Sequence, residues 1–297
     1  MHLLTTSPAE HLRVFIVHWN SPVECLRTIE ELADQAVPLR ITVIDNRSTP
    51  QSLRALSESL PAGIELLHLD KNLGWGGAVN VALRSWVAAG PEELCVICAH
   101  DALPAPRCLS LIQDAMRADP QLGLACPEHG SGGGVQISAA KGVHIRHAEP
   151  GPAGSVLAMP APHGTLSVLR RSCLRQIGIF DERYFAYGDE TEIGFRAATM
   201  GWKSGMVWGA KVLNPGTSTS HRLRVYLIAR NNILTVYRYF GLFAALVRIA
   251  VTLGSCVRPY SWANKKKVGL LRARLRGVLD SFAFRYGPPP PGYLDRR

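Results

Sequence analysis

Apolar residues in the first hundred positions fall into short uninterrupted runs, separated by longer stretches with helix-like patterning. The runs are bounded by turn-rich segments, as buried strands are, and occupy residues 14–19, 41–45, 64–69 and 94–99. The stretches between them predict helices at about residues 22–35, 50–60 and 78–89. This order predicts an α/β fold with a mostly parallel central sheet and flanking helices. The loops after the first, second and fourth strands should meet at one edge, where such folds bind ligands.

The second half of the chain is less regular. Residues 127–155 are rich in Gly, Pro and Ser and predict a surface loop that contains a short hairpin. Residues 222–257 predict one or two long helices, and a basic helix follows near residues 265–283. We therefore expect two parts, an α/β domain at residues 1–219 and a basic, amphipathic helical region at residues 220–297.

The composition fits a folded chain. It has 297 residues, of which 47% are hydrophobic and 19% charged, and this excludes a mainly disordered chain and a small disulfide scaffold. The most apolar long segment, residues 241–257, is short for a membrane span and carries Arg248, and the N-terminus lacks the pattern of a secretory signal. These features place the chain in the cytoplasm.

Seven cysteines, an odd number, favour free thiols in that compartment. Cys95 and Cys98 form a C-x-x-C pair, but both lie in the predicted strand 94–99. Residues three apart in a strand point to opposite faces, so this pair should not hold a metal or act as a redox disulfide.

Charge is distributed unevenly. Residues 1–219 carry 18 Lys and Arg against 21 Asp and Glu, a net of −3, whereas residues 220–297 carry 15 against 2, a net of +13. The basic part therefore suits an anionic partner such as a membrane surface or a nucleic acid.

Two aspartates follow predicted strands at the binding edge. Asp45 ends the second strand, where a carboxylate can accept hydrogen bonds from a ribose or a base, or can cap a turn. Asp101 follows the fourth strand, where it could hold Mg²⁺ or Mn²⁺ against phosphates, or be a turn residue before Pro104.

Two further segments carry candidate chemistry. The glycine-rich turn NLGWGGAVN, residues 72–80, runs into a helix and could approach a diphosphate closely. The run FDERYFAYGDETEIGFR, residues 180–196, places Asp189, Glu190 and Glu192 at a helix start. Such acids can be simple helix-dipole partners, or crowding can raise the pKa of one of them toward that of a general base.

In this order and spacing the segments resemble glycosyltransferase family 2, an inverting family with the GT-A nucleotide-sugar-binding fold, and in particular its rhamnosyltransferase-like bacterial members. The matching runs are FIVHWNSP, VIDNRST, NLGWGGAVNVAL, the acid after the fourth strand and GTLSVLRRSCLRQIGIFDERYFAYGDETEIGFRAATMGW. The resemblance covers about residues 12–216. It implies transfer of a sugar from a UDP-, dTDP- or GDP-sugar to an acceptor hydroxyl, by single displacement with inversion.

The resemblance implies roles for individual residues. Glu190 would be the general base, with Asp189 and Glu192 orienting it or holding sugar hydroxyls. Asp101 would hold the divalent cation. The remaining implied contacts are with the nucleotide sugar: Asp45 at the base, and Asn72, Gly76, Gly77 and Asn80 along the pocket.

This sequence departs from the family pattern at two places. Ala99 stands where the first acid of the DxD motif is usual, so Asp101 would hold the cation with water and phosphate oxygens. The late metal-binding histidine of the family falls near Asn214, whose amide oxygen could serve, or His221 could substitute. A weak or dispensable requirement for Mg²⁺ or Mn²⁺ follows.

The basic region at residues 220–297, called the tail below, contains features that suggest binding partners. Tyr226 to Asn232 resembles the Y..RN stretch of rhamnosyltransferase-like members, which makes Arg230 a candidate contact for the diphosphate or acceptor, or else a helix-surface arginine. Basic residues interleaved with apolar ones favour an anionic membrane surface over nucleic acid, so the enzyme could be peripheral on the inner membrane face. The apolar helices also offer an interface for an oligomer.

Three hypotheses remain open on the sequence: a transferase, a degenerate nucleotide-sugar-binding protein, and a basic-tailed nucleic-acid binder. The donor sugar is not specified, although its selection should depend on the pocket around Trp75, His163 and residues 164–167. The acceptor can be a glycan, a lipid-linked glycan or a small molecule.

Overall fold

The computed structural model describes residues 11–129, 133–138, 142–216, 219–257 and 265–294. Its first half alternates strands and helices: β1 (Leu12–His18), α1 (Pro22–Ala33), β2 (Leu39–Asp45), α2 (Pro50–Ser59), β3 (Glu65–His68), α3 (Gly74–Ala89), β4 (Leu94–Ala99), β5 (Leu103–Pro104) and α4 (Cys108–Ala118). The second half contains β6 (Leu122–His129), β7 (Gly133–Ser138), β8 (Gly142–His147), β9 (Val156–Ala158), β10 (Leu166–Arg170), α5 (Arg171–Ile177), the 3-10 turn η2 (Glu182–Tyr184), α6 (Asp189–Thr199), β11 (Lys203–Leu213), α7 (His221–Val257) and α8 (Lys265–Phe282).

One sheet organises residues 12–213, the α/β part of the chain. Its strands lie in the order β3-β2-β1-β4-β10-β6-β11-β5, and β9 pairs with β11. The pairs β3-β2, β2-β1, β1-β4 and β6-β11 are parallel, whereas β10 runs antiparallel to both β4 and β6. The predicted α/β class with a mostly parallel sheet is therefore confirmed, with β10 as a reversed strand in the middle.

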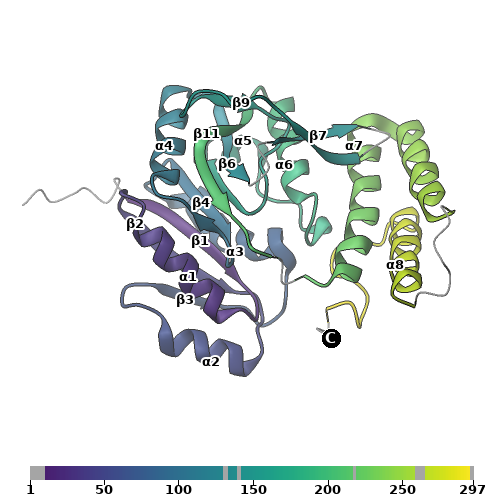
Figure 1. The fold of residues 1–297 in the computed structure, drawn as a ribbon, viewed down its shortest axis with the longest axis horizontal. Coiled ribbons are helices and arrows are strands. Elements are labelled where there is room, and N and C mark those ends of the chain that lie inside the picture. The colour runs from purple at the N-terminus through teal and green to yellow at the C-terminus, as the bar shows by residue number, and fades with distance from the viewer. Residues whose placement is uncertain (1–10, 130–132, 139–141, 217–218, 258–264, 295–297) are drawn as a thin grey trace, which may run out of the picture.

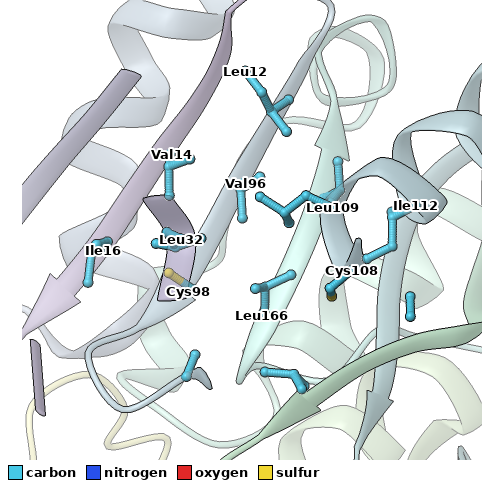
Figure 2. Close-up of a cluster of buried hydrophobic side chains, with 14 of the residues drawn as sticks. Leu12, Val14, Ile16, Leu32, Val96, Cys98, Cys108, Leu109, Ile112 and Leu166 are labelled. Carbon is cyan, nitrogen blue, oxygen red and sulfur yellow. The ribbon is translucent and has the colours of Figure 1, made fainter. Parts of the chain in front are cut away.

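Helices cover both faces of the sheet (Figure 1). On one face, side chains of α1, α2 and α4 join a core that includes Leu32, Leu56 and Ile112. Figure 2 shows much of this core, with Leu32, Leu109 and Ile112 beside the strand residues Val14 and Val96. On the other face, α3, α5 and α6 form a second core.

Cys95 and Cys98 lie in different cores. Cys98 belongs to the core beneath α1 and α4, and Cys95 to the core beneath α3 and α5. Both thiols are fully buried, and burial is the main reason that their pKa values lie well above the usual range. The predicted placement on opposite faces is confirmed, and these thiols act as apolar packing groups.

The glycine-rich run differs from its prediction. The helix was expected from about Ala78, but α3 begins at Gly74, so the glycines form its first turn. Gly74 has φ +75°, and a Cβ on it would overlap the carbonyl of Phe185. These glycines therefore serve close packing between α3 and a second segment of backbone, a contact that local pattern does not reveal.

The C-terminal region is helical, as predicted, and of the one or two long helices expected over residues 222–257 the structure has two, followed by the basic helix α8. Gly241 has φ +83° and ψ 178°, so residues 221–240 and 242–257 are separate helices joined at a sharp turn. The region His221–Ser255 is long and apolar enough to cross a membrane by length and composition, and 28% of its most apolar window is buried. Residues 221–240 pack beside the α/β part of the chain, and residues 242–257 run beside α8 (Figure 1).

Candidate active site

A cavity of about 500 Å³ lies at the carboxyl edge of the parallel strands. Val17 of β1 and Ala99 of β4 line its floor, and Asn46 follows β2. The strands are in register, with His18 opposite Asp45 and Val17 opposite Ala99, so their ends reach the same edge together. The cavity therefore lies at the edge that the order of strands predicts.

Asp101 and Asn214 meet in this cavity. The Asn214 Nδ2 group donates a hydrogen bond of 3.2 Å to Asp101 Oδ1, although the two residues follow different strands, β4 and β11. Asp101 is 8% exposed, and burial raises its pKa to about 6, an effect that the hydrogen bond from Asn214 reduces. The Asp101 carboxylate thus faces the amino group of Asn214, whose amide oxygen accepts a hydrogen bond of 3.1 Å from the backbone N–H of Gly216.

Glu190 projects into the cavity from the first turn of α6. Its Oε1 lies against Gly164 so closely that a Cβ at that position would overlap it. The backbone N–H of Gly188 donates a hydrogen bond of 3.4 Å to its Oε2. Gly164 and Gly188 therefore lie against the carboxylate, which lines the cavity and is partly buried.

Asp189, its neighbour, has a different environment. It is fully buried at the start of α6, and within the described residues neither of its carboxylate oxygens has a hydrogen bond of normal geometry. Burial first, and the charge of Glu190 second, raise the pKa of Asp189 well above its usual range. Of the two adjacent acids, Asp189 is thus the one that favours its neutral form.

Asp45 is fully buried beneath the cavity, between two histidines. His18 Nδ1 and His68 Nδ1 each lie 2.8 Å from one of its carboxylate oxygens, and the backbone N–H of Ser48 donates to it as well. These hydrogen bonds outweigh the opposing effect of burial and lower its pKa to about 2. Asp45 is not among the described residues that line the cavity, so its contact with a nucleoside stays a prediction. Such a contact would require His18 or His68 to give up its hydrogen bond with the carboxylate.

Asn46, directly after it, organises the loop that leads into α3. Its side chain donates to Asn72 Oδ1 and to the carbonyl of Gly74, and accepts a hydrogen bond from the backbone N–H of Leu73. Both Asn46 and Asn72 line the cavity. The structure therefore brings the predicted Asn72 to the site.

Gly76, Gly77 and Asn80 lie inside α3 and support the site from behind. A Cβ at Gly76 would come within 3.2 Å of Asp189 Oδ2, so this glycine allows α6 to approach α3. Asn80 Nδ2 donates to the carbonyl of Phe180, whose N–H donates back to Asn80 Oδ1. These three residues are absent from the described cavity lining, and a direct contact with the nucleotide stays a prediction.

The loop before Asp189 has an unusual backbone. Phe185 and Tyr187 have positive φ values of 65° and 64°, and Gly188 follows with φ 108°. For a residue with a side chain, this region is unfavourable by about 1–3 kcal/mol, so surrounding contacts must hold the loop. The loop in turn contacts the start of α3, because the carbonyl of Phe185 accepts a hydrogen bond of 2.6 Å from the N–H of Trp75.

The contacts that hold this loop come from α7. The Nδ2 group of Asn231, which is 1% exposed, lies 2.9 Å, 2.8 Å and 2.8 Å from the carbonyl oxygens of Tyr184, Ala186 and Tyr187. One side-chain amide nitrogen thus lies within hydrogen-bond distance of three loop carbonyls, and that of Tyr184 also accepts from Arg230 and from the backbone N–H of Ala186.

Arg230, beside it, is fully buried, so its expected alternative as a helix-surface arginine is wrong. Its guanidinium donates to the carbonyls of Arg183, Tyr184 and Gly287. The donors that a diphosphate would need are used by backbone, because the tail folds over them. A direct contact between Arg230 and a ligand stays a prediction.

Sequence reasoning missed the wall that α7 contributes to the cavity. This wall consists of Leu223, Arg224, Leu227, Ile228 and Asn232. Spacings of three and four residues could have shown that they share a helix face, but not that this face meets the cavity. The expected boundary at residue 219 accordingly does not separate the site from the tail. The predicted specificity residues Trp75 and His163 also line the cavity.

Comparison with known proteins decides the family. The model of the family "Glycosyl transferase family 2" matches residues 13–178, more than half of the chain. The chain belongs to glycosyl transferase family 2. It is a glycosyltransferase, and its sheet and flanking helices form the GT-A fold.

This glycosyltransferase resembles a curated enzyme and several solved structures. It is 27% identical over 243 residues to the N-acetylglucosaminyl-diphospho-decaprenol L-rhamnosyltransferase of Mycobacterium tuberculosis, covering 71% of this chain and 74% of that one. The mannosyltransferase PcManGT of Pyrobaculum calidifontis, solved with GDP-Man and Mn²⁺, has a TM-score of 0.58 at 16% identity, with 94% of this chain and 90% of that chain covered. GalNAc-T7, solved with UDP, GalNAc and Mn²⁺, has a TM-score of 0.66 at 13% identity, with 94% and 57% covered. The solved structures support the fold alone.

The environment of Asp45 yields a prediction about stability. Because its pKa falls from 3.8 to about 2, ionised Asp45 stabilises the folded state above about pH 4, and this contribution is lost as pH falls toward 2. We expect Asp45→Asn to lower the free energy of unfolding at pH 7 by about 2 kcal/mol, a difference that shrinks below pH 4. Urea unfolding at several pH values measures it, with the exposed Asp70→Asn as the control. Unchanged stability with weaker nucleotide binding would instead support a direct contact with the nucleoside.

The contacts of Asn231 yield a second prediction. Asn231→Ala removes the side-chain donor of the Ala186 and Tyr187 carbonyls, whereas the Tyr184 carbonyl keeps its hydrogen bonds from Arg230 and from the N–H of Ala186. Each unsatisfied buried group costs about 1–3 kcal/mol, so we expect a loss of at least about 2 kcal/mol in the free energy of unfolding. Asn232→Ala, the same substitution one position along, removes a buried amide for which the described residues show no hydrogen bond, and it should cost less. Equal losses in the two variants would contradict a special role for Asn231.

Proposed function

We propose that this glycosyltransferase transfers a sugar from a nucleoside-diphosphate donor to an acceptor hydroxyl in a single displacement that inverts the anomeric carbon. The observation that carries this proposal is the position of Glu190. It is a carboxylate in the cavity lining, contacted by Gly164 and Gly188, and it has no ion pair among the described residues. A general base needs this arrangement, because it must receive a proton from the acceptor.

Asp189 supports this role as a positioning residue. Burial and the charge of Glu190 raise its pKa, which favours its neutral form, so Asp189 itself is unsuited to taking a proton at the cavity. Glu192 is fully buried and pairs with Arg196 and Arg238, which suits it to holding the start of α6 in place. We assign the proton transfer to Glu190 alone.

A divalent cation fits beside Asp101 and Asn214. Among the described residues no cluster of three or more His, Cys, Asp or Glu side chains could hold a metal by itself. The Asp101 carboxylate would be one ligand, and the Asn214 amide oxygen a second once the amide turns from Gly216 toward the cation. Diphosphate oxygens and water would complete the set, since Mg²⁺ and Mn²⁺ accept such oxygen ligands. When bound, such a cation neutralises charge that develops on the leaving diphosphate. Asp101 and Asn214 would hold it, and this small ligand set is consistent with weak binding.

We propose a lipid-linked acceptor, reached in the cytoplasm at a membrane surface. The name of the mycobacterial relative specifies a decaprenol-linked acceptor and an L-rhamnosyl donor group. In this chain, Leu223, Leu227 and Ile228 offer an apolar cavity wall, with Arg224 beside them as a cation for a phosphate. A nucleoside-diphosphate rhamnose is therefore the first donor to test, with UDP-, dTDP- and GDP-sugars compared directly.

The role of Glu190 predicts a specific loss of activity. Glu190→Gln keeps the shape of the side chain but cannot accept the proton, so we expect transfer to fall by about 10²–10⁴-fold while nucleotide binding is retained. Turnover and nucleotide affinity are measured together, with the exposed Glu58→Gln as the control. The anomeric configuration of the product, read by NMR, should be opposite to that of the donor. A wild type that binds nucleotide without turnover would favour the degenerate binding protein instead.

Gly164 offers an independent test of the same carboxylate. Gly164→Ala places a methyl group where Glu190 Oε1 lies, and the flexible carboxylate can move away at little cost in stability. We expect transfer to fall by at least about tenfold with nucleotide affinity and melting temperature nearly unchanged, because misplaced catalytic groups lose large factors in rate. Gly216→Ala, where a Cβ would meet nothing within 4 Å, is the matched control. Full activity of Gly164→Ala would argue against Glu190 as the base.

A further inference from the structure

The turn at Gly241 separates two kinds of helix. Before it, residues 221–240 pack against the catalytic part and line the cavity. After it, residues 242–257 pair with α8, for example through the hydrogen bond of 2.9 Å from Arg274 Nη1 to Ser255 Oγ. This helical pair stands at one side of the molecule, beyond the first half of α7 (Figure 1).

The helical pair exposes an unusual number of large apolar side chains. In the described chain, sixteen such side chains are exposed by more than a third, and twelve of them lie after residue 227. Phe243 is 81% exposed, Phe282 72% and Leu279 64%, in a chain whose other exposed apolar residues are scattered. We define the apolar surface by the residues on this pair and its flanks: Phe240, Leu242, Phe243, Leu246, Val251, Leu253, Leu275, Leu279, Phe282 and Phe284.

The charge around the apolar surface is of one sign. The only acidic side chain of the tail within the described residues, Asp280, is buried and accepts hydrogen bonds from Tyr226 and Arg276. The exposed Arg272 and Arg276 alternate with the apolar residues of α8, and the exposed Arg285 follows its end. The tail as a whole carries 15 basic residues against 2 acidic ones.

This combination discriminates among occupants of the apolar surface. A second copy would bring two regions of net charge +13 together, which opposes association through this face. A nucleic acid would use the arginines but leave Phe243 and Phe282 in water. An anionic bilayer uses both, because its headgroups attract arginines and its acyl boundary accepts the aromatic and aliphatic side chains.

The geometry also favours lying on a bilayer over crossing it. Residues 242–257 span about 24 Å at 1.5 Å per residue, short of the roughly 30 Å hydrocarbon core. The turn at Gly241 keeps this helix from continuing the preceding one, which is committed to the catalytic part.

We propose that the apolar surface and its arginines dock this enzyme on an anionic membrane surface. The inference rests on the proposed lipid-linked acceptor, and it explains how such an acceptor would reach the cavity from the membrane. The same helix, α7, carries the apolar surface after Gly241 and the cavity wall of Leu223, Leu227 and Ile228 before it. Docking therefore brings the cavity toward the plane in which a lipid-linked acceptor is held.

The test is sedimentation of the full chain with vesicles of phosphatidylglycerol and phosphatidylcholine, compared with phosphatidylcholine alone. We expect the wild type to bind the anionic vesicles and to release with rising salt. The double variant Phe243→Glu, Leu279→Glu should bind at least about tenfold less. The control Val23→Glu, Met200→Glu alters two apolar residues of the α/β part that are 74% and 55% exposed, and it should bind as the wild type does.

Nucleotide affinity and transfer to a water-soluble acceptor analogue, measured on the same variants, separate this inference from the proposed function. Both should be unchanged in Phe243→Glu, Leu279→Glu, whereas transfer to an acceptor embedded in vesicles should fall. Absence of wild-type binding to anionic vesicles overturns the inference, as does equal loss in the control. So does a tight complex with RNA or a dimer that the double variant abolishes while vesicle binding persists. Absence of transfer in every protein would instead overturn the proposed function.

Discussion

The catalytic arrangement depends on how one strained loop is held. Residues 183–188 carry two positive φ values on residues with side chains, and that backbone directs Phe185 toward α3 and starts α6 at Asp189. Asn231 and Arg230 keep the loop in this form by donating to its carbonyls from a helix more than 40 residues later in the chain. Helix α3, Glu190 and helix α7 therefore all depend on this loop. Displacement of any one of them would disturb the others.

Three buried carboxyl groups have pKa values that their surroundings shift in different directions. Asp45 is surrounded by donors, and its pKa is low. Asp101 and Asp189 are buried with few donors, and their pKa values are raised. The hydrogen bonds of Asp45 stabilise the fold. Asp101 and Asp189 instead favour a ligand or a neighbour that offsets the cost of burying a charged carboxylate. The donor set beside Asp101 is thus suited to a cation that arrives with its own phosphate ligands.

Much of the fold followed from local pattern. The apolar runs locate β1, β2 and β4, and their order predicts the edge at which Asp101 and Asn46 meet. The motif around Glu190 places it at a helix start, where the structure has it. These features depend on residues close in sequence or on the general handedness of α/β folds.

The remainder depends on long-range contacts, which local pattern does not encode. Helix α3 begins at Gly74, and this glycine packs against Phe185, about 110 residues later. Arg230 looks like a surface residue by its charge, yet the loop and the tail bury it. Asp45 ends a strand at the position expected of a residue that binds a nucleoside, but its carboxylate oxygens form hydrogen bonds with His18 and His68. The apolar wall of α7 needed the three-dimensional structure for the same reason.

The most direct measurement is a crystal structure of this chain with a nucleoside-diphosphate sugar and Mn²⁺. The account predicts the diphosphate in the cavity, with the cation in contact with Asp101, and the carboxylate of Glu190 on the side of the anomeric carbon opposite the diphosphate. A donor whose anomeric carbon faces away from Glu190, or a cation held without Asp101, would contradict it.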